Sequence, residues 1–299
     1  TCTIVAAGSI AKQVLAECGV QVYAFVREAA GVRCPDLGHD LELDRTRRYR
    51  QMRRDLDPFY QHVYVSGRIT PEMRFLEKTR VFAEIEQQID AIRDGAPAMD
   101  PAEVRDRYGV HPVINCPDLD AAQAMVEACN RVSASGDSSG GLVEVVVLGA
   151  PVGLGEPVFA KLDAELGRML GIGAVKGVEV GAGFAVRNMV GSQTNDQMRS
   201  DGRTVLFDSN QAGGITGGLS TGQPIIVRLA VKPTPTIAKA QHTIDKYTLE
   251  NRELAAITRR DPTIVARVWP VAEAFTALVI LDNLMAYYGY EELKRRIGS

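Results

Sequence analysis

The sequence carries no excess of charge of either sign. Lysine and arginine together number 34 against 37 aspartate and glutamate residues, which leaves a formal net charge of −3 over 299 residues. A chain without a basic field is not drawn electrostatically to nucleic acid or to an anionic membrane surface. We therefore expect no nucleic-acid or membrane partner, and any anion site must be built locally from a few side chains.

The sequence also lacks the cysteine and histidine spacings of metal sites and disulfide frameworks. Its five cysteines are odd in number and include no Cys-x-x-Cys pair, which predicts free thiols in a reducing cytosol. The histidines occur in unrelated contexts and are expected in loops or at the surface. They are His39, His62, His111 and His242. No metal site is predicted.

No hydrophobic run is long and uninterrupted enough to cross a membrane. The longest one, at residues 271–285, is interrupted by Glu273 and Asp282. Residues 4–15 indicate a helix and lack the charge and cleavage pattern of a signal peptide. Because the chain opens inside that helix, we expect either that an upstream part is missing or that the N-terminus is unusually abrupt.

Apolar periodicity predicts alternating helices and strands, separated by glycine and proline, as in a layered α/β or α+β fold. The hydrophobic content of 45% suits a packed core. Helices are expected near residues 4–19, 118–130, 156–171 and 270–288, and strands near 20–26, 142–148, 175–184 and 225–231. The buried stripe of the third helix is predicted to be Val158, Leu162, Leu166 and Leu170.

The region from about 31 to 112 is predicted to be a charged helical insertion in a single domain that spans residues 1–299. Six arginines between Arg45 and Arg54 are mixed with acidic residues, and a further helix is expected over 71–93. The arginines fit either a nucleic-acid-binding arm or a solvated helix face that is balanced by acids. The second interpretation is favoured, because acids are interspersed with the arginines.

Two local motifs suggest chemistries that the rest of the sequence does not support. Residues 136–141, Gly-Asp-Ser-Ser-Gly-Gly, are similar to a loop of trypsin-like proteases, but they contain an extra serine and no Ala-Ala-His-Cys sequence precedes them. We interpret them as a turn before a strand. The glycine-rich stretch 149–155 contains Pro151, which argues against a dinucleotide-binding turn. No P-loop sequence is present.

The candidate functional residues lie in three segments nearer the C-terminus. The paired glycines of 213–222 allow a flat ligand, or another backbone, to lie against the main chain. Residues 232–236, Lys-Pro-Thr-Pro-Thr, present a cation and hydroxyls on a backbone that two prolines hold extended. Arg259 and Asp261 supply an anion contact and a proton acceptor. These segments favour a polyanionic ligand beside a base, although each alone also fits a structural turn, a strand exit or a helix cap.

Taken in order, these motifs resemble chorismate synthase, a family of flavin-dependent lyases. The resemblance covers residues 4–26 and about 113 to the C-terminus. The similar stretches are 5–11, 116–118, 136–141, 153–159, 174–181, 191–192, 195–196, 213–222, 232–236 and 259–273. The resemblance implies an α+β fold, a β-α-β sandwich that is incomplete at the N-terminus. It also implies elimination of phosphate from 5-enolpyruvylshikimate 3-phosphate to give chorismate, with reduced FMN as cofactor, NADP as an associated nucleotide, and a cytoplasmic homotetramer.

Carried over by position, the resemblance assigns flavin contacts and one catalytic residue. The catalytic residue is Asp261, which matches the aspartate that lies near the flavin and helps to accept the substrate proton. The flavin contacts are Gly173, Ala174, Gly217, Lys232, Pro233, Thr234, Pro235, Thr236 and Arg259.

The chain departs from the family pattern in several places. Arg260 stands where histidine is usual, Thr263 stands where cysteine is common, and the 31–112 region is longer. The Phe-Gly-Glu-Ser-His-Gly and Gly-His-Ala-Asp motifs and an Arg-Ser-Ser stretch are absent, and with them the two family histidines that donate protons. The sequence therefore predicts the C-terminal two-thirds or so of a chorismate synthase, inactive by itself. The alternative is a catalytically silent remnant that binds flavin or assembles with other subunits.

Overall fold

The computed structural model describes residues 1–57, 100–256 and 261–289, with a few isolated residues between 58 and 99 and after 289. The chain divides into two compact units. The first consists of Thr1–Cys34 together with Ala124–Ser299, and the second of Pro35–Gln123. Helices and antiparallel strands occur together in the first unit, which confirms the predicted α+β class.

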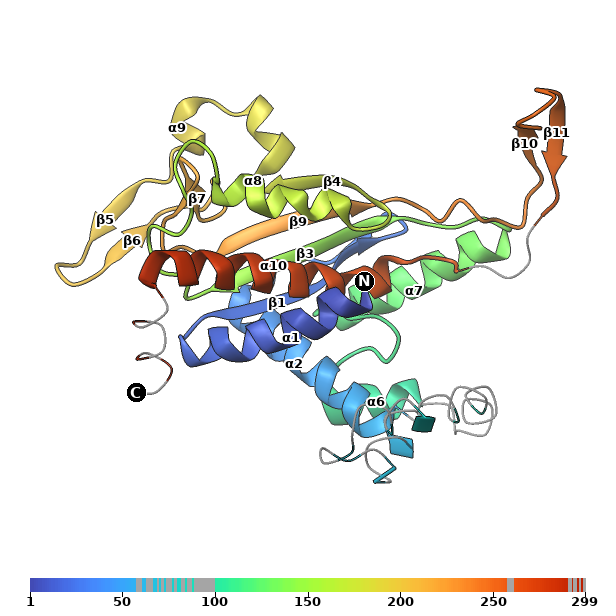
Figure 1. Cartoon of the computed structure of the whole chain (residues 1–299), viewed down its shortest axis with the longest axis horizontal. Coiled ribbons are helices and arrows are strands. Elements are labelled where there is room, and N and C mark those ends of the chain that lie inside the picture. Colours follow the sequence, from blue (N-terminus) through green and yellow to red (C-terminus); the bar gives the residue numbers. More distant parts are fainter. Residues whose placement is uncertain are drawn as a thin grey trace. The chain divides into compact units, whose positions relative to one another are not determined.

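A five-stranded antiparallel sheet forms the centre of the first unit, with strand order β2-β1-β3-β9-β4 (Figure 1). The valine-rich run near 142–148 and the run near 225–231, both predicted as strands, are the neighbouring strands β3 and β9. The central residues of β3 are buried on both faces, which explains its continuous apolar sequence. The strands are β1 (Gln21–Ala29), β2 (Val32–Arg33), β3 (Gly141–Leu148), β4 (Val175–Val180) and β9 (Ile225–Val231).

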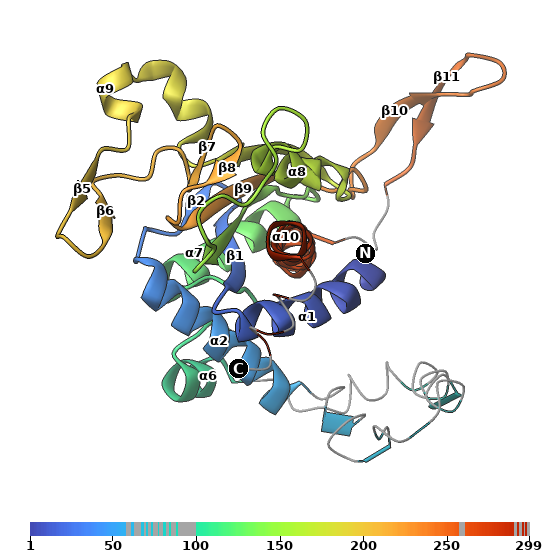
Figure 2. The same cartoon turned by 60° about the vertical axis from the view of Figure 1, so that its left-hand side comes forward.

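Two long helices pack against each other and against this sheet (Figures 1 and 2). Helix α1 (Cys2–Glu17) contacts β1, and α10 (Val265–Tyr288) contacts β1 and β3. A Cβ atom on Gly8 would lie 2.4 Å from the Cβ atom of Ala274. Glycine at this position therefore lets the two helix backbones approach each other closely.

Glu273 on α10 joins both helices to the sheet. Its buried carboxylate pairs with Lys12 of α1 and accepts a hydrogen bond from the backbone N–H of Ala24 on β1 at 2.8 Å. The helix begins five residues earlier than predicted, so Pro270 lies inside it. By length and composition α10 could also cross a membrane, but 50% of its apolar stretch is buried here, as in a core helix.

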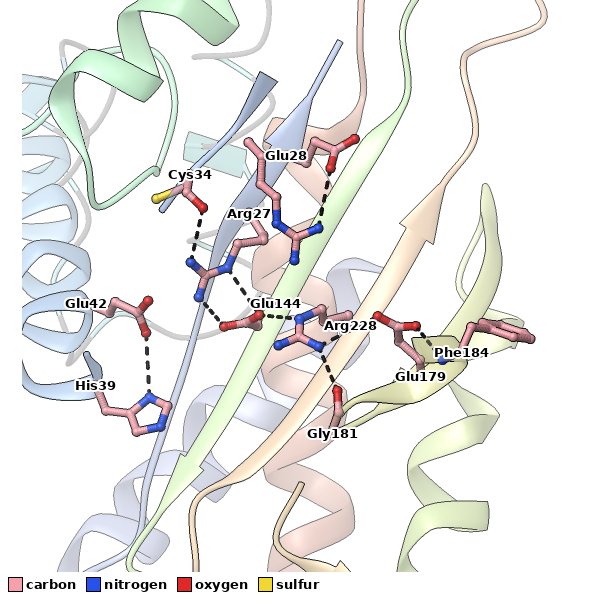
Figure 3. Close-up of polar contacts among 11 residues, drawn as sticks. Arg27, Glu28, Cys34, His39, Glu42, Glu144, Glu179, Gly181, Phe184 and Arg228 are labelled. Carbon is pink, nitrogen blue, oxygen red and sulfur yellow. Dashed lines mark hydrogen bonds and ion pairs between the residues drawn. The ribbon is translucent and has the colours of Figure 1, made fainter. Parts of the chain in front are cut away.

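A row of charged side chains crosses the middle of the sheet (Figure 3). Arg27 on β1 binds both carboxylate oxygens of Glu144 on β3, at 2.5 and 3.2 Å, and Arg228 on β9 binds Glu144 at 2.6 Å. Arg228 also donates to the carbonyl oxygen of Gly181 at 2.7 Å and lies 3.7 Å from Glu179 on β4. Glu144 is only 1% exposed, so two guanidinium groups replace water around its charge. A one-residue slip of any strand would turn its charge to the other face of the sheet.

The third predicted helix is shorter than expected. Its predicted first turn is not helical, and the helical part consists of α8 (Leu162–Gly167) and a 3-10 turn, η2 (Arg168–Gly171). Val158 has a φ of 77° and is exposed, and Leu170 is also exposed, whereas Met169 is buried. The tighter winding of the 3-10 turn moves the buried position by one residue.

The remaining elements of the first unit are short. Strand β4 ends at Val180, earlier than predicted, because Gly181 and Gly183 adopt positive φ angles. The 3-10 turn η3 (Gly183–Asn188) and the short helix α9 (Gly191–Thr194) follow. Three two-stranded hairpins are formed by β5 (Met198–Ser200) with β6 (Val205–Phe207), β7 (Ile215–Thr216) with β8 (Leu219–Ser220), and β10 (Gln241–Ile244) with β11 (Asn251–Leu254).

The second unit contains α2 (His39–Leu56), α6 (Pro101–Tyr108) and the first residues of α7 (Leu119–Ala134). Two arginines of α2 pair with acids one turn away, Arg48 with Asp44 at 2.7 Å and Arg53 with Asp57, as predicted for a solvated helix face. The helix predicted over 71–93 lies mostly outside the described residues.

His111 lies in a loop of the second unit, as expected, but its ring is buried. Its Nδ1 atom accepts a hydrogen bond from the backbone N–H of Val113 at 3.2 Å, and its Nε2 atom lies 3.3 Å from Oε1 of Gln123. Burial lowers the pKa of His111 more than the hydrogen bond to Gln123 raises it. We therefore assign a neutral imidazole that donates through Nε2.

Candidate functional site

Three segments that are far apart in the sequence meet at the end of β9. They are the turn at 136–141, the segment at 232–236 and the residues just before α10. The Ser138 hydroxyl donates to the carbonyl oxygen of Thr234 at 2.6 Å, and the Thr234 hydroxyl donates to the carbonyl oxygen of Asp261 at 2.9 Å. Two side-chain hydroxyls thus fasten the three segments to one another.

Backbone contacts complete this cluster. The Ser139 N–H donates to the carbonyl oxygen of Pro262 at 2.9 Å. A Cβ atom on Gly140 would lie 2.4 Å from the carbonyl oxygen of Val231 and 3.1 Å from Cδ of Pro233. Any side chain at Gly140 would therefore push the 232–236 segment away from the turn.

Gly173 and Ala174 lie beside the same segment. The backbone N–H of Lys232 donates to the carbonyl oxygen of Ala174 at 2.9 Å. Ala174 has a φ of 69°, a left-handed conformation that residues other than glycine rarely adopt, and Gly173 before it is exposed. Strained backbone of this kind is often found at ligand-binding sites.

Several donors of the 232–236 segment are unused within the described part of the chain. The Lys232 ammonium and the Thr236 hydroxyl belong to exposed residues and have no hydrogen-bond or ion-pair partner among the described residues. The same holds for the backbone N–H groups of Thr234 and Thr236. A cation, a hydroxyl and two N–H groups on one stiff segment can bind an anion. The Thr234 hydroxyl, in contrast, is occupied by Asp261 and holds the loops together.

The carboxylate of Asp261 is held at the edge of this cluster. Its Oδ2 atom lies 3.0 Å from Nη1 of Arg267 on α10, and its side chain is 40% exposed. The carboxylate is therefore oriented by a cation and still open to a ligand. The predicted anion contact Arg259, together with Arg260, lies outside the described residues.

Gly217 does not join this cluster within one copy of the chain. It lies in the turn between β7 and β8, and that hairpin follows residues that bond to the start of β9, since the Ile226 N–H donates to the carbonyl oxygen of Gly213. Lys232 follows the opposite end of β9 (Figure 1). A strand of this length spans about 20 Å, so the predicted flavin contacts fall into two groups.

Sequence reasoning gave Ser138 and Ser139 no role, because it interpreted 136–141 as a turn before a strand and, beyond that, only as a stretch similar to the family. Two consecutive serines between glycines were the available signal, since small hydroxyl residues often bond to a neighbouring backbone. It also missed the charged row of the sheet. The available signal was one charged residue inside each of two apolar strands, Glu144 in β3 and Arg228 in β9. A buried charge needs a partner, so the two could have been paired.

Comparison with known proteins places these features in a family. The sequence model described as chorismate synthase matches residues 1–285. The chain belongs to the chorismate synthase family. The match includes the turn at 136–141, the segment at 232–236 and Asp261, so all the segments of the cluster lie within family sequence.

Curated relatives named chorismate synthase come from bacteria and archaea. The chain is 48% identical over 188 residues to the Acetivibrio thermocellus protein, covering 62% of this chain and 48% of the relative. It is 51% identical over 173 residues to the Methanosarcina barkeri protein, covering 58% and 47%. It is 36% identical over 282 residues to the Methanococcoides burtonii protein, covering 94% and 60%. The chain thus spans about half the length of these relatives.

A solved structure agrees with the fold. A crystal structure of a chorismate synthase aligns with 99% of this chain and 67% of its own, with a TM-score of 0.60 and 23% identity. At this identity the similarity concerns the architecture. It supports the chorismate synthase fold. The alignment covers nearly the whole chain, and so it includes the central sheet with helices α1 and α10.

Proposed function

We propose that the protein containing this chain is a cytoplasmic chorismate synthase. It eliminates phosphate from 5-enolpyruvylshikimate 3-phosphate, gives chorismate, and uses reduced FMN. The observation that carries the proposal is the convergence of 136–141, 232–236 and Asp261 at one end of β9, with the Lys232 ammonium unpaired among the described residues. The similarity of residues 1–285 to the chorismate synthase family supports the same reaction.

The residues of the cluster fit a flavin mononucleotide. Lys232, Thr236 and the free N–H groups offer donors to its anionic or carbonyl edge, and Pro233 and Pro235 keep those donors in place at little entropic cost. Gly173 and Ala174 leave room beside Lys232 for a flat ring, and Arg259 adds a further anion contact. Reduced flavin, when bound, assists the loss of phosphate and is not consumed.

Asp261 is the proposed proton acceptor. The ion pair with Arg267 orients its carboxylate, and the bond from the Thr234 hydroxyl fixes its backbone to the cofactor segment. A base that is held in this way accepts the substrate proton without first reorganising the loop.

Gly217 requires a different arrangement. Because it lies at the opposite end of β9 from Lys232, we propose that in a homotetramer it contacts the flavin of a neighbouring copy. Mixing two inactive variants tests this idea. A Gly217→Val subunit and an Asp261→Asn subunit should together regain part of the activity. In the mixed assembly, some sites combine the unchanged Asp261 of the first subunit with the unchanged Gly217 of the second. If the mixture stays as inactive as each variant alone, Gly217 and Asp261 serve the same copy or Gly217 has another role.

The proposed reaction is tested with Asp261→Asn in the whole protein. The amide keeps the backbone acceptor but not the base, so turnover should fall about 10²–10⁴-fold while FMN affinity is unchanged. Asp282→Asn on the exposed side of α10 is the matched control and should leave turnover intact. Chorismate and phosphate are measured anaerobically with reduced FMN. Turnover of Asp261→Asn at the parent rate would refute the proposed role of Asp261.

A further inference from the structure

The turn of the β7–β8 hairpin carries two backbone donors that no described part of the chain uses. Gly217 and Gly218 form a two-residue loop between the paired residues Thr216 and Leu219, and their φ angles are positive, 65° and 89°. Their N–H groups have no hydrogen-bond partner among the described residues. Gly218 is a buried residue, and the N–H groups of buried residues are rarely left without a partner. Successive N–H groups in a turn can bind an anion.

The side chain of Lys161 lies across this turn. Helix α8 contacts β8, and Lys161 stands directly before that helix (Figure 2). A Cβ atom on Gly218 would lie 2.5 Å from Cγ, 2.8 Å from Cβ and 3.0 Å from Cδ of Lys161. The aliphatic part of the lysine therefore packs on the main chain of Gly218, and any side chain there would displace it. The Nζ atom is two bonds beyond Cδ, which keeps the ammonium close to the turn.

The ammonium of Lys161 is available to a ligand. Lys161 is exposed, and its side chain has no ion-pair or hydrogen-bond partner within the part of the chain that the structure describes. The acids nearest to it in the sequence have other partners. Asp163 accepts a backbone N–H of α8 at 2.9 Å, and Glu165 pairs with Arg168 at 2.8 Å. A free cation thus adjoins two free N–H groups, as it does in the 232–236 segment at the other end of β9.

Hydrogen bonds fasten the loop that carries the lysine to the hairpin. The Leu162 N–H donates to the carbonyl oxygen of Gly218 at 2.9 Å. The hydroxyl of Ser220 on β8 is buried, accepts the Leu154 N–H at 2.8 Å and donates to the carbonyl oxygen of Pro151 at 2.5 Å. These bonds hold the cation beside the two N–H groups before any ligand arrives, which lowers the entropic cost of binding an anion.

We propose that Lys161 and the N–H groups of Gly217 and Gly218 form a second anion site, which binds a phosphate monoester. A phosphate suits these donors because its oxygens accept a charge-assisted bond from the ammonium and further bonds from both N–H groups. FMN and 5-enolpyruvylshikimate 3-phosphate both carry such a group. The choice between these two ligands rests on the proposed function, whereas the anion site itself does not. The site adds a cation and a bound chemical group to the contact proposed for Gly217.

The first experiment compares Lys161→Gln with the unmodified whole protein. If the site holds the phosphate of reduced FMN, the variant should bind reduced FMN about tenfold more weakly and reduced riboflavin, which has no phosphate, as before. If the site holds the substrate phosphate, the KM for the substrate should rise about tenfold at unchanged kcat. Lys161→Arg should keep most of the affinity in either case. Lys246→Gln removes another exposed lysine as the matched control and should change neither constant.

Two results of this experiment would overturn the proposal. The first is an unchanged FMN affinity together with an unchanged KM in Lys161→Gln. The second is an equal loss of affinity for FMN and riboflavin, which would show that Lys161 supports the loop and does not bind a phosphate. The fluorescence melt of Trp269 checks that the variants fold.

Acetylation of the lysines tests the anion site without flavin or substrate. Inorganic phosphate is the probe, chloride at equal ionic strength is the reference, and mass spectrometry follows the rate at each lysine of the unmodified protein. Phosphate should slow acetylation of Lys161 severalfold and leave Lys246 unchanged. Equal rates at Lys161 in phosphate and chloride would overturn the site. A protein that shows this protection but binds neither FMN nor substrate would refute the proposed function and leave the anion site in place.

Discussion

Replacing Gly8 by alanine should destabilise the first unit, although alanine is the better helix former. Gly8 is buried in α1 and faces α10, where an added Cβ atom would lie 2.4 Å from Cβ, 2.5 Å from Cα and 2.7 Å from the carbonyl oxygen of Ala274. Two of these atoms belong to the backbone, so no change of rotamer relieves the overlap. The helices must move apart by about 1 Å to reach normal contact distances of roughly 3.5–4.0 Å.

The size of the effect follows from two opposing terms. Alanine gains about 1 kcal/mol over glycine inside a helix. Overpacking of a rigid core costs about 1–3 kcal/mol, and here it also disturbs the bonds that Glu273 makes to Lys12 and Ala24. We expect a net loss of about 1–2 kcal/mol in the free energy of unfolding. For a unit of this size that loss lowers the melting temperature by roughly 2–8 °C.

Because the chain has a single tryptophan, its fluorescence reports on unfolding at one place in the structure. Trp269 lies in α10, so its fluorescence follows the separation of α1 and α10 during urea or thermal unfolding. Gly167→Ala is the control, since this glycine also lies in a helix, as the last residue of α8, but an added Cβ atom would have no neighbour within 4 Å. The control should gain about 0.5–1 kcal/mol. Equal changes of the same sign in the free energy of unfolding of both variants would refute the reasoning. Helix propensity alone would then account for both changes.

Three further changes test other parts of the structure. Thr46→Val should raise the free energy of unfolding by about 1 kcal/mol in urea titrations, because the Thr46 hydroxyl is fully buried and has no hydrogen-bond partner among the described residues. Burial lowers the pKa of His111 below its usual value of about 6.5. The unfolded chain therefore binds a proton that the folded chain does not, and urea midpoints of the second unit should fall as the pH drops from about 7 to 5, a loss that His111→Gln should remove. Desolvation raises the pKa of Asp196, but hydrogen bonds from a serine hydroxyl and from the Ala212 and Gln211 N–H groups outweigh it and leave the pKa lowered. Asp196→Ala should speed hydrogen exchange of those two amides about tenfold or more, and unchanged rates would contradict a protective role of these hydrogen bonds.

The strands and long helices of the first unit could be predicted from sequence because each has its own local pattern. The runs that became β3 and β9 are short and largely apolar, and the alternation of buried with less buried residues along β9 is that of a strand. The end of α1 and the Asp118 cap of α7, which accepts the Ala121 N–H at 2.7 Å, were equally local.

The predicted bounds that were wrong depend on contacts between residues that are distant in the sequence, which a local pattern does not reveal. Val158 has the spacing of a helix stripe, yet Gly153 and Gly155 place positive φ angles just before it and the chain turns there instead. The last helix was predicted to begin near Pro270, and proline is compatible with a first turn. The packing of the residues before it, such as Val265 and Val268, extends the helix backwards into the core.

The candidate site illustrates the same division between local and distant information. The residue types of the 232–236 segment and of Asp261 indicated an anion site, and their chemistry can be read without a fold. Their closeness is produced by β3 and β9, whose pairing of Gly141 with Val231 places the turn at 136–141 directly against the exit of β9. Ser138 then lies beside the residues that follow β9, and its hydroxyl bonds to the carbonyl oxygen of Thr234. Gly217 shows the opposite case. The glycine-rich run around it also indicated a ligand, but it lies near the start of β9, whereas the other segments meet at the end of that strand.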